Sequence, residues 1–130
     1  MSRLPSTADR VEALPQLPSL SIAESRDFYC SFLGFGEVVY EDDSFLILRR
    51  QFAGAPIELH FWLTDNRAFC EHSSVYLRGG GIDVLHADFA ARNVPDMSAL
   101  AVRPWNMEEF HVRDPHGNLL KFGRIPLAQD

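Results

Sequence analysis

Apolar and polar residues alternate along several short segments of the chain, and this alternation predicts β-strands. Segment 57–63 is the clearest case, because alternate residues of a strand face opposite sides. One face carries Ile57, Leu59, Phe61 and Leu63, and the other carries Glu58, His60 and Trp62. We predict further strands at 37–40, 45–50, 74–78, 99–103, 109–113 and 119–124, with an extended, proline-containing segment at 11–20.

Two other segments show the spacing of an amphipathic helix. Ser21 followed by Glu24 forms a capping-box pattern, which predicts a helix from there to about Leu33, with Gly34 as its end. A second helix is predicted at 82–93. The aromatic residues that we assign to the core are Phe28, Phe32, Phe89 and Phe122.

The predicted elements occur twice in the same order. Residues 11–65 and residues 72–125 each read as β-α-β-β-β, and a polar connector joins them. A chain of 130 residues is long enough to bury one core. We therefore predict an α+β fold with a single domain over residues 1–130, in which two tandem modules form a curved mixed sheet with the helices outside.

Composition excludes several classes of function. With a formal net charge of -6, the chain lacks the clustered cations that nucleic-acid binding needs. No apolar run reaches the roughly 20 residues that span a bilayer, and the first residues lack the apolar stretch of a signal peptide. Cys30 and Cys70 form no CxxC pair, so we expect two reduced thiols in a cytoplasmic protein.

Two motifs connect this pattern with a known family. Residues 28–35 read Phe-Tyr-x-x-x-Leu-Gly-Phe and residues 114–118 read Asp-Pro-x-Gly-Asn. Together they resemble the glyoxalase, bleomycin-resistance and extradiol-dioxygenase superfamily, also called the vicinal oxygen chelate superfamily. Segment 104–115, which contains Trp105 and Glu109, is similar to a stretch of bleomycin-resistance proteins. The resemblance implies a glyoxalase-like fold.

The resemblance also indicates where metal-using members of the superfamily carry their ligands. These positions fall on Leu14, Ser74 and Lys121, and none of these side chains is a good ligand for a divalent ion. We therefore predict no metal, no cofactor and no catalytic residue. The alternative is a metal-dependent lyase or dioxygenase of the same superfamily, with Glu58, His60 and His72 as ligands in a different register.

Two further histidines are expected to face solvent. His86 lies on the second predicted helix, and His116 lies in the predicted hairpin turn at 114–118. Neither has a cysteine, serine or aspartate at a spacing typical of nucleophilic catalysis.

The implied function is that of a bleomycin-resistance protein. Such a protein sequesters a bleomycin-type glycopeptide antibiotic without chemical turnover, as a homodimer that exchanges its N-terminal strand between subunits. We expect a planar, cationic ligand, held by stacking on aromatic rings and by nearby carboxylates. The predicted ligand-binding residues are Trp105, Trp62, Phe45, His60, Asp42, Asp43 and Glu58.

Two departures from the family pattern reshape the rim of the predicted groove. Asn106 stands where the family usually has glycine, and segment 52–56 reads as an extra loop. A third interpretation therefore stays open beside the binder and the enzyme: a dimer with this fold that binds an unrelated metabolite.

Overall fold

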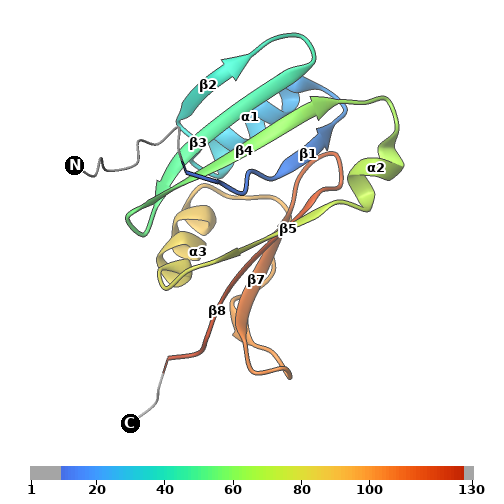
Figure 1. The fold of residues 1–130 in the computed structure, drawn as a ribbon. Coiled ribbons are helices and arrows are strands. Elements are labelled where there is room, and N and C mark those ends of the chain that lie inside the picture. Colours follow the sequence, from blue (N-terminus) through green and yellow to red (C-terminus); the bar gives the residue numbers. More distant parts are fainter. Residues whose placement is uncertain (1–9, 128–130) are drawn as a thin grey trace, which may run out of the picture.

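The computed structural model describes residues 10–127, which form two modules with the same order of elements (Figure 1). The first module contains β1 (Gln16–Ser19), α1 (Ile22–Phe32), β2 (Glu37–Glu41), β3 (Phe45–Phe52) and β4 (Ala55–Leu63). A short helix, α2 (Arg67–Glu71), connects it to the second module. That module contains β5 (Ser74–Arg78), α3 (Ile82–Ala91), β6 (Ala101–Val102), β7 (Glu108–Arg113) and β8 (Leu119–Arg124). The predicted α+β class and the repeated β-α-β-β-β order are confirmed.

Each module folds into its own four-stranded sheet, and the two sheets have the same topology. Sheet A has the order β1-β4-β3-β2, and sheet B has the order β5-β8-β7-β6. In both sheets the first strand pairs in parallel with the last, while the other pairs are antiparallel. The architecture is thus two mixed sheets, where the sequence suggested one.

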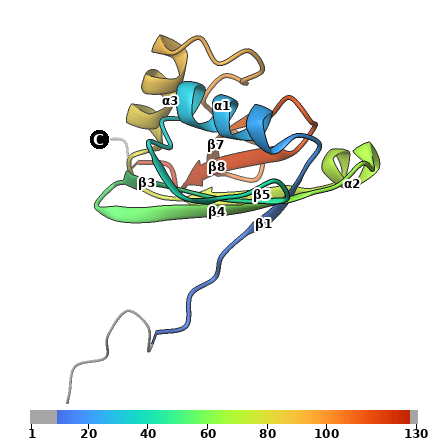
Figure 2. The same cartoon turned by 90° about the horizontal axis from the view of Figure 1, so that it is seen from above.

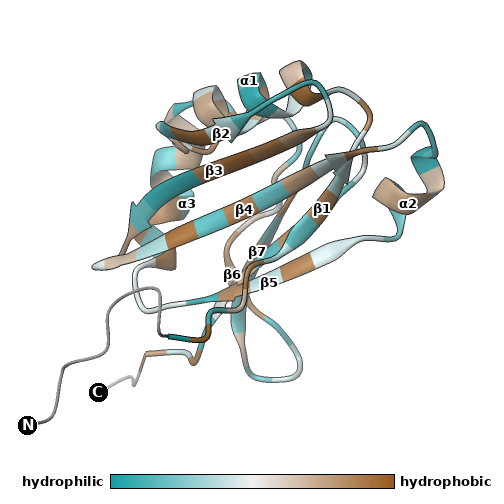
Figure 3. Ribbon diagram, turned by 45° about the horizontal axis from the view of Figure 1, so that its top comes forward, coloured by the Kyte–Doolittle hydropathy of each residue, from teal (hydrophilic) through white to brown (hydrophobic). Residues whose placement is uncertain are grey.

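Helices α1 and α3 lie on the same side of the two sheets (Figure 2). Hydrophobic and hydrophilic residues alternate along β4 (Figure 3), and such alternation directs one set of side chains toward the helices. Beneath α1, Tyr29 packs on Phe61 with their ring centroids 4.7 Å apart. Beneath α3, Phe89 meets Phe122 edge-on with their centroids 5.6 Å apart. The opposite face of each sheet is left uncovered by helices.

The cap and the terminating glycine predicted for α1 are confirmed, but the second bond of the capping box is not. Ser21 is the N-cap and its side chain accepts a hydrogen bond from the backbone N–H of Glu24. Glu24 does not return the bond, because its carboxylate is 2.8 Å from Nε2 of His116. The backbone N–H of Ser21 donates to Ser19 instead. After the helix, Gly34 adopts a φ of 71°, a left-handed conformation that favours glycine.

A buried carboxylate joins the second module to the first. Asp114 sits in the β7–β8 turn, where its Oδ1 atom accepts hydrogen bonds from the backbone N–H groups of residues 116, 117 and 118. Its Oδ2 atom accepts the hydroxyl of Tyr29, at 2.8 Å, and the amide of Asn118. Burial is the main cause that raises the pKa of Tyr29 well above its ordinary value, and the charge of Asp114 adds to it. Tyr29 is therefore the donor in this contact.

The expectation that His116 faces solvent is wrong. Its side chain is buried, because the turn that carries it packs against the start of α1. The backbone N–H of Leu20 donates to Nδ1, so Nε2 carries the hydrogen that is donated to Glu24. His86 also departs from the prediction, since it is half-buried and its Nε2 atom is 3.1 Å from the carbonyl of Ser98.

Several predicted boundaries change for identifiable reasons. Segment 52–56 is no extra loop, because Ala53 and Gly54 form a tight turn with positive φ and both strands extend to it. The strand predicted at 99–103 shortens to β6, which pairs with β7 over two residues only. The extended segment at 11–20 enters a sheet only from Gln16 onward. Strands β5 and β8 have the predicted ends.

Both cysteines are free thiols, and Cys70 is buried. Within residues 10–127, no helix has both the length and the apolar character needed to cross a membrane.

We predict that Tyr29→Phe lowers the free energy of unfolding by about 1–3 kcal/mol, since the buried carboxylate of Asp114 loses one charge-assisted hydrogen bond. Urea titration followed by circular dichroism measures this loss. Tyr40→Phe is the matched control, because that hydroxyl binds Asp42 at an exposed position and its removal should matter little. Equal losses in the two variants would contradict a structural role for the Asp114 junction.

Candidate functional site

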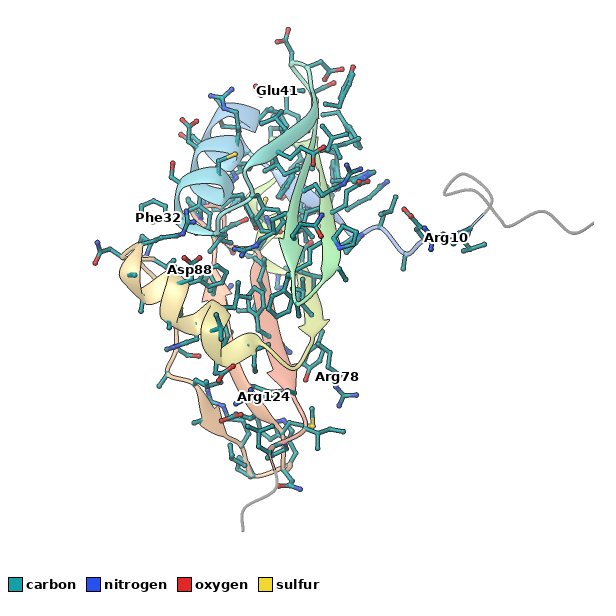
Figure 4. The ribbon with its side chains drawn as sticks, turned by 90° about the vertical axis from the view of Figure 1, so that its left-hand side faces the viewer. Arg10, Phe32, Glu41, Arg78, Asp88 and Arg124 are labelled. Carbon is teal, nitrogen blue, oxygen red and sulfur yellow. The ribbon has the colours of Figure 1, made fainter. Side chains whose placement is uncertain are left out.

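The site is built on the sheet faces that no helix covers. In Figure 4 the helices lie on one side of the sheets, and the N-terminal segment with Arg10 leaves on the other, the side to which Arg78 also points. Strand register places the residues of each uncovered face. We call the first the open face of sheet A; it comprises Glu37, Tyr40, Phe45, Ile47, Arg49, Glu58, His60 and Trp62. The open face of sheet B comprises Ser74, Tyr76, Arg78, Glu109, His111, Arg113, Leu119, Lys121 and Gly123.

Aromatic side chains gather on the open face of sheet A, as the sequence predicted for this strand pair. Phe45 lies directly opposite Trp62 in the β3–β4 ladder. The ring of Phe45 also meets the imidazole of His60 edge-on, with the centroids 5.7 Å apart. Trp62 packs against Phe69 of α2, with their centroids 5.9 Å apart. The rings of Phe45, His60 and Trp62 are half-buried and Phe69 is exposed, so this cluster offers aromatic surface for contact with a planar molecule.

The charges on this face are already paired. Glu58 accepts two hydrogen bonds from Arg49, the shorter at 2.6 Å, and its other oxygen is 2.7 Å from Nε2 of His60. The hydrogen bond from His60 is the main cause that lowers the pKa of Glu58, and Arg49 adds to it while burial opposes it. Arg49 also bonds Glu37. Glu58 is therefore an ionised carboxylate with two partners, which reduces the charge it can offer a ligand.

The two predicted acidic residues of the β2–β3 turn differ from each other. Asp42 accepts hydrogen bonds from the backbone N–H groups of Ser44 and Phe45 and from the hydroxyl of Tyr40. The bond from Tyr40 is the main cause that lowers the pKa of Asp42. Asp42 thus holds the turn in shape. Asp43 is exposed, and its side chain makes no hydrogen bond or ion pair with other residues in the described range.

Trp105 lies on the other module, in the turn between β6 and β7. Its side chain is 63% exposed, which is high for tryptophan. Its indole N–H donates to Oε1 of Glu109 at 3.0 Å, and the hydroxyl of Tyr76 donates to Oε2 at 2.6 Å. Gly123 leaves room for that hydroxyl, because a Cβ atom there would overlap it. One carboxylate therefore fixes two aromatic side chains at the edge of the open face of sheet B.

A cavity of about 880 Å³ lies where the two modules and the N-terminal segment meet. Its wall includes Glu58 and Arg49 from sheet A, Tyr76 and Arg78 from sheet B, and Leu14 from the N-terminal segment. The volume is within the range of small-molecule sites. Of the seven predicted ligand-binding residues, Glu58 is the one that lines this cavity.

Within one chain, the predicted site is divided between the modules. Phe45, His60, Glu58 and Trp62 share the open face of sheet A, and Asp42 and Asp43 lie at one end of it. Trp105 lies beside sheet B, and its indole N–H donates to Glu109 of the same module.

The positions considered for a metal carry poor ligands. Ser74 and Lys121 lie one row apart on the paired strands β5 and β8, Leu14 lies on the N-terminal segment, and His72 caps α2. Among residues 10–127, no three His, Cys, Asp or Glu side chains are placed to hold one ion together. Glu58 and His60 form a hydrogen bond with each other, and among the described residues no third ligand joins them.

Sequence reasoning missed the contribution of Tyr76 and Glu109. Glu109 was part of the segment that resembles bleomycin-resistance proteins, but its use as a double acceptor depends on Tyr76, which is 33 positions earlier in the chain. The proximity of Gly123 to Tyr76 in the β5–β8 pair was the available signal, since a glycine inside a strand often marks a close approach.

Comparison with known proteins agrees with the motif analysis. No family model matches the chain. A bleomycin resistance protein of Geobacillus stearothermophilus is 26% identical over 131 residues, which covers 86% of this chain and 95% of that protein. The bleomycin-binding protein of the bleomycin producer Streptomyces verticillus, solved with copper(II)-bleomycin, is 27% identical with a TM-score of 0.73, over 87% of this chain and 94% of that one.

A further solved structure supports the fold alone. The bleomycin resistance determinant encoded on transposon Tn5 is 23% identical with a TM-score of 0.76, over 91% of this chain and 100% of that one. The chain is therefore similar to bleomycin resistance proteins and has a two-module, glyoxalase-like fold.

Proposed function

We propose that this chain is a cofactor-free binding protein that sequesters a bleomycin-type glycopeptide antibiotic and so gives resistance without chemical turnover. Trp105, Trp62, Phe45 and His60 contact the flat part of the ligand in this proposal. Asp43, together with Asp42 and Glu58, meets its cationic part. The similarity to a bleomycin-binding protein that was solved with its ligand supports this class of ligand.

The observation that carries the proposal is the state of Trp105. A large aromatic ring that is mostly exposed contributes little to the stability of its own fold, yet its indole N–H is already satisfied by Glu109. One hydrogen bond therefore favours a single orientation of this ring before any ligand arrives. A preorganised aromatic surface loses little conformational freedom on binding, and this favours affinity.

The division of the predicted residues between two modules favours a homodimer. If sheet A of one subunit faces sheet B of another, Trp105 and the rings around Phe45 lie on opposite walls of one groove. The N-terminal segment supports this arrangement, because it extends away from the body on the side of the open faces (Figure 2). Val11 is fully exposed there and Leu14 is partly exposed. Exchange of this segment between subunits would bury both side chains.

We predict that bleomycin quenches the fluorescence of Trp105 as it binds. The Trp62→Phe variant leaves Trp105 as the single indole reporter, so a titration of this variant isolates the signal. Trp105→Ala should then weaken binding about thirtyfold, measured by calorimetry, because loss of a central aromatic contact costs about 2 kcal/mol. Val84→Ala on the helix side is the control and should bind normally. The absence of quenching at micromolar bleomycin would rule the proposal out.

We also predict that the full chain has about twice its monomer mass of 14.7 kDa in solution, measured by light scattering after size-exclusion chromatography. Val11→Asp should shift the population toward monomer, since a charge would be buried on exchange of the N-terminal segment. Val84→Asp introduces the same charge at a position that is 72% exposed on α3 and should leave the mass unchanged. A monomeric wild-type chain at high concentration would contradict the dimer.

The enzyme alternative is addressed by metal analysis. We expect less than roughly 0.1 equivalent of any divalent ion in the purified chain, because the part of the chain that the structure describes gives Glu58 and His60 no third ligand. Mass spectrometry of the acid-digested protein measures the metal content after incubation with Zn²⁺, Mn²⁺ and Fe²⁺ and removal of excess ion. One bound equivalent that disappears in His60→Ala would favour the enzyme.

A further inference from the structure

Lys121 is the single lysine of the sequence, and it occupies the centre of the open face of sheet B. Strand register places it directly between Tyr76 of β5 and His111 of β7. Both Lys121 and His111 are exposed, and Tyr76 is 45% exposed. The side chain of Lys121 is therefore on an open surface in one row with Tyr76 and His111, and the Tyr76 side chain reaches over Gly123 to Glu109.

Cations without a carboxylate partner concentrate on this module. Within residues 10–127, ion pairs hold Arg26, Arg49, Arg50, Arg92 and Arg124. In the same range, no acidic side chain lies within ion-pair distance of Lys121, Arg78 or Arg113, all on the open face of sheet B. Arg78 donates a hydrogen bond to the thioether of Met107, and Arg113 donates one to the backbone carbonyl of Gly117. Three cations thus share this face with one carboxylate, Glu109.

Glu109 forms no ion pair with the lysine in the described structure. Its two oxygens accept hydrogen bonds from Trp105 and Tyr76, and it lies opposite Gly123, one row along the strands from Lys121. The open face of sheet A shows the opposite arrangement, because its one arginine, Arg49, is paired with two carboxylates. In a chain of net charge -6, a face of net positive charge attracts anions locally, where the molecule as a whole repels them.

The distances suit one small ligand. Neighbouring rows on one face of a strand are about 7 Å apart, since each residue advances about 3.4 Å. The Lys121 row is next to the row of Glu109, which holds the exposed ring of Trp105. A molecule with a flat ring system of two or three fused rings could therefore stack on Trp105 and place a substituent beside Lys121.

We propose that Lys121 is an anion-binding subsite of this groove, and that the ligand class it selects is a flat aromatic molecule bearing a carboxylate, sulfonate or phosphate. The inference rests on the binding role proposed above for this face and changes the ligand chemistry expected from it. The acidic group contacts the ammonium of Lys121, with His111 and Tyr76 beside it, while the ring contacts Trp105.

The test uses two probes that share a ring and differ in charge, naphthalene-2-sulfonate and 2-naphthylmethylammonium. Calorimetric titration of the full chain should show at least about tenfold tighter binding of the sulfonate, the effect of one charge-assisted hydrogen bond. Lys121→Gln should abolish this preference, and Lys121→Arg should restore most of it. Arg67→Gln, which removes an arginine of α2 outside this face, should keep it.

A second readout reports on the lysine itself. Reductive ¹³C-methylation gives one side-chain dimethylamine signal, because the sequence has one lysine, and this signal should move on addition of the sulfonate. A signal that stays in place, a preference unchanged in Lys121→Gln, or no sulfonate binding at millimolar concentration would each overturn the inference. The inference would also be overturned if dimerisation alone shifted the dimethylamine signal, because Lys121 would then contact the partner subunit.

The same variants separate this inference from the proposed function. Bleomycin binding that persists in Lys121→Gln, together with no sulfonate preference in the wild type, would leave the antibiotic-binding role standing and remove the anion subsite. The opposite result is a sulfonate preference that depends on Lys121 together with no binding of bleomycin. It would leave the anion subsite standing, remove the antibiotic-binding role, and direct the search to acidic aromatic ligands.

Discussion

The arrangement of the molecule depends on the buried carboxylate of Asp114. It gathers three backbone N–H groups of its own turn and the hydroxyl of Tyr29, so a hairpin of the second module is attached to a helix of the first. A charge in the interior is stable only when its hydrogen bonds are complete, and here five donors complete them. Asn118 extends the attachment, because its amide also donates to the carbonyl of Pro18 in β1.

This attachment has a geometric result for the binding surface. With the β7–β8 turn fixed against β1 and α1, the helices of both modules stay on one side and the open faces on the other (Figure 2). The two open faces then differ in chemistry, since one has paired charges among aromatic rings and the other has unpaired cations beside an exposed tryptophan. Such asymmetry within a repeated topology allows two unlike parts of one ligand to be recognised.

The sequence predicted the elements whose signals are local. The serine cap of α1, the glycine that ends it, and the limits of β5 and β8 all follow from residues within a few positions of each other. The orientation of Glu58, His60 and Trp62 also followed, because a period of two is imposed by the strand. The aromatic cluster of sheet A was therefore predictable, although the internal use of Asp42 and Glu58 was not.

What could not be predicted involves pairs far apart in sequence. His116 is buried only because its turn meets Leu20 and Glu24, 96 and 92 positions away. The bond from Tyr76 to Glu109 likewise joins β5 to β7 across 33 positions, whereas Trp105 and Glu109 are only four positions apart. The limits of a short strand such as β6, which forms two residue pairs with β7, depend on the neighbouring strand more than on its own residues.

The presence of one lysine in the chain has a practical consequence for anyone who studies its ligands. Dyes and sensor surfaces are commonly attached to proteins through amines, and apart from the α-amine this protein offers them one side chain, in the middle of an uncovered sheet face. Such coupling would obstruct this face and hide any ligand that binds there. Attachment through a tag, or through the half-buried thiol of Cys30 on the helix side, would leave the face accessible.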